Sequence, residues 1–239
     1  MSGKVEQAVE GLRRMIATGE LSPGARLPSE NDLCNELDVS RSSLREAQKM
    51  LGVAGVLNSR PGSGTFVSQL TPEDFMSGLR ITVPLLPLEE FLGLCDVRAV
   101  LEGHAAAQAA ARLDDAQTER LVELAEQVAA VPWTQETAEL DNEFHELLVS
   151  GAHNASIAAL LAIIRTRGRH YRIFDSTDGV ALKAESDESH RRIAEAVRRR
   201  DTEAARLEAM NHVMTTRRWL EGYQPRPEPA SDLHPLQGG

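Results

Sequence analysis

The segment that most constrains the fold of this chain is 27–67, where two short helical patterns are followed directly by a glycine-rich hairpin pattern. Ser29 and Ser40 are residue types that cap helix N-termini, so a helix is predicted after each of them. Short β-type runs at 56–57 and 65–67 flank the sequence Arg-Pro-Gly-Ser-Gly, which predicts a two-stranded hairpin. Two helices and a hairpin in this order predict a winged helix-turn-helix, a fold typical of binding to duplex DNA.

An amphipathic helix is expected before this segment, because apolar residues recur at helical spacing between Val5 and Ala17. The helix after Ser40 has two different faces. Its apolar stripe contains Leu44, Ala47, Leu51 and Ala54. Its basic stripe, on roughly the opposite side, contains Arg41, Arg45 and Lys49. We therefore expect one face to pack on the core and the other to contact DNA, with Arg60 of the hairpin reaching into the neighbouring groove.

A net charge of −10 is unfavourable for a protein that approaches phosphates, but the charge is unevenly distributed. Residues 1–70 carry 8 Lys and Arg against 8 Asp and Glu, whereas residues 71–239 carry 18 against 28. Residues 41–60 contain four basic side chains and one acidic side chain, Glu46, so their local net charge is +3. The basic charge is therefore concentrated at the predicted contact helix and hairpin.

Residues 1–70 resemble the DNA-binding domain of the GntR family of bacterial transcription regulators. The matching runs are Pro23-Gly24, Leu27–Glu30, Val39–Arg41, Leu44–Ala47 and Gly62–Val67. The resemblance implies a homodimer that binds double-stranded operator DNA. It also implies base and phosphate contacts from Arg41, Ser42, Ser43 and Arg45 and from the wing near Gly62.

Two positions depart from the family pattern. Asn31 stands where family members often carry Arg, which puts one phosphate or base contact in doubt. Asp38 stands in the turn where Gly is frequent, but Asp tolerates the left-handed backbone conformation at small cost. We expect the turn to form despite the second departure.

From Thr71 onward the sequence predicts helices almost exclusively, so the fold class is expected to be mainly α. An aromatic content of only 4%, with abundant Ala and Leu, favours helical packing over sheets. Helices are expected near 73–83, 88–111, 115–130, 135–150, 154–174, 181–199 and 202–221, with Asn154 and Asp201 as N-caps.

The prolines at 72, 84 and 87 mark a junction between domains. The expected domains are a winged helix-turn-helix at 1–70, a linker with a short helix at 71–87, an all-α bundle of six to seven helices at 88–222, and a disordered tail at 223–239. The sequence has no early apolar run of signal-peptide type and no stretch suited to spanning a membrane, so a cytoplasmic protein is expected. Cys34 and Cys95 lie in helical patterns and are interpreted as buried thiols.

Side chains that can bind metals recur on the helices of the predicted bundle. Asp141 and His145 are four residues apart on one helix face, and His190 and His212 lie on two later helices. A single histidine is more often a hydrogen-bonded core or surface residue than a ligand, and spacing does not show that these residues converge. The remaining histidines are interpreted as packing or surface residues (His104 and His170), a loop residue (His153) and a tail residue (His234).

Residues 88–220 resemble the FCD ligand domain of the FadR-type subfamily of GntR regulators. The residues that match the motifs of this domain are Arg98 and Glu102, Asp141 to His145, His190 to Ile193, Ala196 to Asp201, and His212. The resemblance implies that one divalent metal ion is bound by Asp141, His145, His190 and His212. The founding fatty-acid regulator of the subfamily lacks this set and binds acyl-CoA, so the set argues against an acyl-CoA ligand here. Three imidazoles and one carboxylate suit zinc, nickel, manganese or iron.

We therefore expect a transcription regulator, a repressor if it follows most relatives, that is controlled by a small organic acid bound next to the metal. Arg98 would hold the carboxylate of this acid, and the alternative is an ordinary i,i+4 salt bridge with Glu102. The basic run Arg165, Arg167, Arg169 and Arg172 is interpreted as a solvated or interdomain face, with the lining of the same cavity as the alternative.

Two other functions remain open, a metal sensor and a metalloenzyme that uses the histidines and aspartate as its metal site. No residue stands out as a general base or nucleophile beside the ligand set, and an enzyme would have no use for a DNA-binding domain. We therefore expect a protein that is not an enzyme and predict no catalytic residue.

Overall fold

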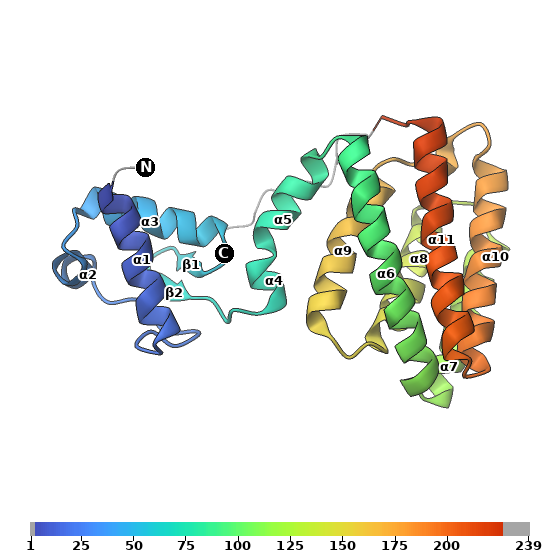
Figure 1. Ribbon diagram of the computed structural model, residues 1–239, viewed down its shortest axis with the longest axis horizontal. Coiled ribbons are helices and arrows are strands. Elements are labelled where there is room, and N and C mark those ends of the chain that lie inside the picture. Colours follow the sequence, from blue (N-terminus) through green and yellow to red (C-terminus); the bar gives the residue numbers. More distant parts are fainter. Residues whose placement is uncertain (1–2, 227–239) are drawn as a thin grey trace. The chain divides into compact units, whose positions relative to one another are not determined.

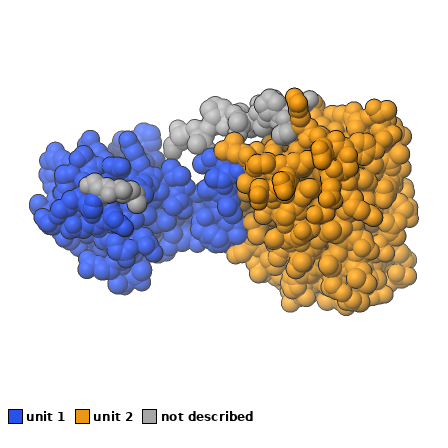
Figure 2. Space-filling model, turned by 45° about the horizontal axis from the view of Figure 1, so that its top comes forward, with its two compact units in different colours: residues 1–82, 231–239 blue, residues 83–230 orange. Residues whose placement is uncertain are grey.

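The computed structural model describes residues 3–226 of the chain, which divides into two compact units (Figures 1 and 2). Unit 1 contains the residues up to 82, and unit 2 begins at residue 83. The tail predicted at 223–239 lies mostly outside the described residues, and so does His234. Within the described part, the last helix extends to Tyr223.

Unit 1 contains the predicted helices and hairpin in the predicted order. They are α1 (Gly3–Ala17), α2 (Glu30–Leu37), α3 (Arg41–Val53), β1 (Leu57–Arg60) and β2 (Gly64–Val67). The predicted N-caps are confirmed, because the hydroxyl of Ser29 accepts a hydrogen bond from the backbone N–H of Asp32 and that of Ser40 accepts one from Ser43. Asp38 ends α2 in the left-handed conformation, with φ 49°, as expected for the turn.

The core of unit 1 lies where α1, α2 and α3 meet the hairpin. Burying each large apolar side chain there stabilises the fold by roughly 1.5–3 kcal/mol. Ala54 is exposed because α3 ends one residue before it, so the prediction that it continues the buried stripe is wrong. The buried residues include Leu12, Met15, Leu33, Leu44, Leu51, Leu57 and Val67.

The helix predicted at 73–83 is interrupted. The structure instead has α4 (Pro72–Phe75), α5 (Ser77–Thr82) and a 3-10 turn, η1 (Val83–Leu85). Thr71 caps α4 through a capping box with Asp74. Pro84 has no N–H to donate, which prevents the helix from continuing through η1.

Unit 2 is a bundle with six α-helices among its described residues, within the predicted number (Figure 1). Its helices are α6 (Leu88–Arg112), α7 (Asp115–Ala130), α8 (Gln135–Ser150), α9 (Ala155–Arg169), α10 (Gly179–Arg198) and α11 (Thr202–Tyr223). Helices α6 and α11 lie side by side, and α10 packs against α7 and α11. The N-caps predicted at Asn154 and Asp201 are confirmed.

Helix α9 is shorter than the predicted 154–174. It ends at Arg169, and the chain then passes through Arg172, in the left-handed conformation with φ 45°, into a second 3-10 turn, η2 (Ile173–Asp175). The core of unit 2 contains fully buried side chains from five of the helices, including Leu121, Leu124, Phe144, Leu148, Ile193 and Ala209.

Both cysteines are free thiols within helices, as predicted, although Cys34 is only half-buried while Cys95 is buried. Across the part of the chain that the structure describes, no helix combines the length and the apolar character required to cross a membrane.

Candidate metal centre

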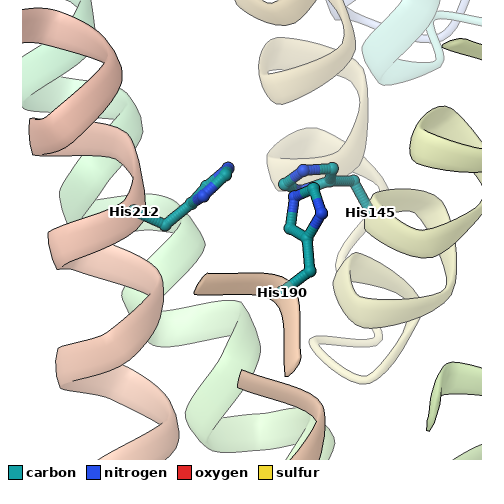
Figure 3. A group of neighbouring side chains, drawn as sticks. All are labelled: His145, His190 and His212. Atoms are coloured by element: carbon teal, nitrogen blue, oxygen red, sulfur yellow. The ribbon is translucent and has the colours of Figure 1, made fainter. Parts of the chain in front are cut away.

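Three histidines from three helices converge inside unit 2. His145 lies on α8, His190 on α10 and His212 on α11, and Figure 3 shows their rings pointing toward a common centre. One ligand nitrogen from each ring lies within 4.8 Å of the others. The ring centroids of His190 and His212 are 4.6 Å apart. This geometry can hold a single metal ion.

Burial favours the neutral form of the His190 and His212 imidazoles, which is the form that binds metals. His145, His190 and His212 are 2%, 1% and 6% exposed. Burial lowers the pKa of His190 to about 4. Burial is also the main cause that lowers the pKa of His212 well below its ordinary value, and repulsion between the protonated forms of His212 and His190 adds to it.

Several ring nitrogens in this cluster lack a hydrogen-bond partner among the described residues. They are Nδ1 of His145 and both ring nitrogens of His190. A buried polar atom without a partner costs roughly 1–3 kcal/mol, and metal coordination would remove part of this cost. The donor set and its unpaired nitrogens therefore fit a divalent metal ion.

Asp141 lies one helical turn before His145, at the edge of this cluster. Its Oδ1 atom is 3.8 Å from Nε2 of His145 and 3.6 Å from Nε2 of His190. Its Oδ2 atom accepts a hydrogen bond of 3.2 Å from Nη2 of Arg165. Asp141 thus lies beside two of the three histidines, although it is not part of the group whose ligand atoms all lie within 4.8 Å.

Helix α6 places a buried ion pair against the histidines. Nε of Arg98 donates to Oε1 of Glu102 at 2.6 Å, and Oε2 of Glu102 is 3.4 Å from Nδ1 of His145. Burial acts to raise the pKa of the Glu102 carboxyl, but the positive charges of Arg98 and Arg165 and the neighbouring His212 hold it below its ordinary value. The i,i+4 pair that was the alternative interpretation of Arg98 therefore exists, and it is buried at the cluster.

The interpretation of the basic run at 165–172 as a solvated or interdomain face is wrong for two of its members. Arg165 and Arg167 are 7% and 4% exposed. Burial lowers the pKa of Arg165 to about 10, so it stays protonated at neutral pH next to Asp141. Arg167 donates to the backbone oxygen of Leu86 at 2.8 Å and to the hydroxyl of Tyr171 at 3.1 Å.

The other two arginines of that run, Arg169 and Arg172, are exposed, in agreement with the interpretation. Sequence reasoning placed Arg165 in the cavity only as the alternative, although the apolar pair Ile163-Ile164 directly before it indicates a buried stretch of helix. Of the remaining histidines, His104 is exposed on α6 and His153 lies in a loop, as predicted.

The predicted DNA-contacting residues of α3 and the hairpin are mostly accessible in unit 1. The exposed ones are Arg41, Ser42, Arg45, Lys49, Arg60 and Gly62, while Ser43 is half-buried. Arg45 forms a bidentate ion pair with Glu30, at 2.8 and 3.0 Å. Arg41 donates to the side-chain oxygen of Asn31 at 2.6 Å, so Asn31 orients one of these arginines.

Both parts of the chain match known families. Residues 4–67 match the family described as bacterial regulatory proteins, gntR family, and residues 93–215 match the FCD domain. The Glc operon transcriptional activator of Escherichia coli (strain K12) is 30% identical over 230 residues, which cover 90% of this chain and 88% of that protein.

Two further proteins show the same likeness. The HTH-type transcriptional regulator LutR of Bacillus subtilis (strain 168) is 27% identical over 217 residues, covering 87% of this chain and 97% of LutR. Among solved structures, Streptococcus agalactiae GntR has a TM-score of 0.58 and 30% identity, covering 90% of this chain and 99% of that chain. The similarity therefore extends over both units.

Proposed function

This chain belongs to the GntR family of DNA-binding transcription regulators and carries an FCD domain, and we propose that its operator affinity is controlled by a small carboxylate bound beside a divalent metal ion. The observation that carries the proposal is the convergence of three buried imidazoles beside Arg98 and Glu102. Such a group of ionisable side chains is costly in a bundle that has only a structural role.

His145, His190 and His212 would hold the ion through ring nitrogens, and Asp141 through Oδ1. Three nitrogens and one oxygen suit zinc, nickel, manganese or iron. When bound, the ion would supply a positively charged coordination site for the carboxylate of the effector. Arg98, oriented by its bond to Glu102, would hold the same carboxylate through its remaining nitrogens.

In unit 1, the operator contacts are assigned to the accessible basic face and the wing. They are Arg41, Ser42, Ser43, Arg45, Lys49, Arg60 and Gly62. Ser42 and Ser43 stand at the N-terminus of α3, where backbone N–H groups favour phosphates. A single winged helix-turn-helix with so few basic residues would bind DNA weakly and with strong salt dependence. Two copies of the chain would therefore act as a homodimer on two half-sites.

We place the protein in the cytoplasm with its DNA, and we take it to be a repressor rather than an enzyme. A metal sensor is the second candidate, because the three histidines by themselves make metal a sufficient signal. The metalloenzyme alternative finds less support, since Arg98 and Arg165 are bound to carboxylates and the chain carries a DNA-binding domain.

The test uses the full chain and an operator duplex recovered by selection from a random library. Operator affinity is measured by fluorescence anisotropy with metal alone, with a panel of carboxylic acids alone, and with both. We expect a change of at least about tenfold only with both, the size of a typical coupling free energy. A change with metal alone would favour the sensor, and no change under any condition would refute control through this site.

Two variants separate the units in this test. Arg45→Ala removes a proposed DNA contact and is expected to abolish operator binding while leaving the metal content unchanged. His190→Ala removes a proposed ligand and is expected to lower the metal content and weaken the response to acids. Loss of both operator binding and metal content in either variant would indicate misfolding, which circular dichroism would show.

A further inference from the structure

Four charged side chains surround the three imidazoles of unit 2. They are Arg98 and Glu102 from α6, Asp141 from α8 and Arg165 from α9. With neutral imidazoles, two positive and two negative charges leave the cluster uncharged.

A divalent metal ion would change this balance by two positive charges. The side chains of Arg98, Glu102 and Arg165 are at most 8% exposed, so little solvent is available to offset the added charge. An unbalanced charge in such a buried region is costly, and anionic ligands are the means of offsetting it. One carboxylate would leave a single excess positive charge, and two carboxylates would leave none.

Arg165 offers a place for the second carboxylate. Its Nη2 atom donates to Oδ2 of Asp141, which fixes the plane of the guanidinium, while its Nη1 atom is buried without a hydrogen-bond partner within residues 3–226. A guanidinium directs its N–H groups along fixed lines in one plane, and a carboxylate is the complementary acceptor. A metal ion cannot accept this hydrogen bond, and a water molecule would accept it without offsetting the charge.

The two arginines reach the same cluster from different helices and are held in the same way. Arg98 is oriented by Glu102 and Arg165 by Asp141, each through one N–H donor of its guanidinium. Both arginines also lie close enough to Glu102 to stabilise its negative charge. The cluster therefore presents two oriented guanidiniums.

We propose that the effector is a short dicarboxylic acid, with one carboxylate bound by Arg98 and the other by Nη1 of Arg165. This inference rests on the proposed function, because it assumes that an acid binds at this cluster. It goes further in naming the chemical class of the acid and in assigning Arg165 the role of distinguishing dicarboxylates from monocarboxylates.

The experiment compares matched acids by isothermal titration calorimetry with the full chain loaded with zinc. Malate and 2-hydroxybutyrate form one pair, since the second has a methyl group in place of the distal carboxylate, and succinate and butyrate form another. We expect each dicarboxylate to bind roughly 10- to 100-fold more tightly, the contribution of a hydrogen bond to a charged group. The zinc content is measured after each titration, because dicarboxylates chelate zinc in solution.

Variants on α9 test the assigned residue. In Arg165→Gln the ratio of the two affinities is expected to fall to about one, because malate loses more affinity than 2-hydroxybutyrate. Arg165→Lys keeps the charge without the planar fork and is expected to give an intermediate ratio. Arg169→Gln is the matched control, because Arg169 is exposed on the same helix and the ratio is expected to stay at the wild-type value.

Three results would overturn the inference, and each has a distinct meaning. If the wild type binds 2-hydroxybutyrate as tightly as malate, the dicarboxylate class is wrong while an acid-controlled regulator stands. If Arg165→Gln weakens both acids equally, Arg165 only positions Asp141. If the zinc-loaded wild type binds no acid at all, the inference fails together with the proposed function.

Discussion

Replacing His190 by leucine tests whether the histidine cluster exists for metal binding. His190 is 1% exposed, and neither of its ring nitrogens has a hydrogen-bond partner among the described residues. The unpaired N–H of the neutral ring costs about 1–3 kcal/mol, whereas the lost ring contact with Phe144, at 4.7 Å between centroids, is worth about 0.5–1.5 kcal/mol. We therefore expect metal-free His190→Leu to be as stable as the metal-free wild type, or up to about 2 kcal/mol more stable.

Metal is expected to reverse this order. With free metal at 100 times its dissociation constant, the wild type gains about 2.7 kcal/mol, which corresponds to roughly 5–10 °C in melting temperature for a unit of this length. The variant, with one proposed ligand removed, is expected to gain far less. Most substitutions at a buried position lower stability under both conditions, so the reversal is specific to a ligand.

The assay uses thermal unfolding followed by tryptophan fluorescence. Both tryptophans of the chain, Trp133 and Trp219, lie in unit 2, and both rings contact Phe174, so the signal reports on this unit alone. Measurements are made after treatment with a chelator and again after adding zinc, nickel or manganese. His104→Leu is the matched control, because His104 is exposed on α6 of the same unit.

Two results would refute the reasoning. Equal metal-induced shifts in the wild type and in His190→Leu would show that His190 is not a ligand. A metal-free variant that melts several degrees below the metal-free wild type would show that the imidazole is satisfied inside the metal-free bundle.

Three other predictions follow from contacts elsewhere in the chain. Glu30→Gln is expected to strengthen operator binding about two- to fivefold in fluorescence anisotropy. The reason is that the Glu30 carboxylate, which forms an exposed ion pair with Arg45, would no longer compete with DNA phosphates for this arginine. Gly55→Ala is expected to lower the urea midpoint of unit 1 strongly, because Gly55 has φ +75° and its added Cβ would lie 1.7 Å from a backbone oxygen of α4, whereas Gly52→Ala, with ordinary contacts, leaves it nearly unchanged. Burial raises the pKa of Cys95 to about 11, so at pH 8 only the other thiol is expected to react quickly with Ellman's reagent.

Local sequence signals predicted the helices and the hairpin well where the sequence contained a capping residue or a helix-breaking residue. Ser29, Ser40 and Asn154 each begin a helix as expected, because the capping hydrogen bond is made within four residues of sequence. The end of α9 was missed because its chain reversal uses Arg172 in a left-handed conformation, which is uncommon for a residue other than glycine. Nothing in the sequence near Arg172 signals that conformation.

The site was predictable only in part, because it depends on contacts between helices that are distant in sequence. Spacing placed Asp141 and His145 on one face, but the approach of His190 and His212 depends on how α10 and α11 pack. Arg165 was assigned to a solvated face because arginine is seldom buried without a partner, and that partner, Asp141, lies 24 residues earlier on another helix.

The unpaired atoms of the cluster also bear on which kind of metal site it is. A purely structural ion would be expected to close its coordination shell with protein ligands and to leave no polar atom unpaired beside it. Here an ion would satisfy one ring nitrogen each of His145 and His190, but it would not satisfy Nη1 of Arg165, which is itself a donor on a positive group. The same objection applies to a pure metal sensor, since metal alone leaves the arginine unpaired and adds charge that the buried carboxylates do not balance. A carboxylate of an organic ligand would accept a hydrogen bond from Nη1 of Arg165, and its negative charge would offset the charge of the metal ion. The cluster therefore favours an acid effector over metal as the sole signal.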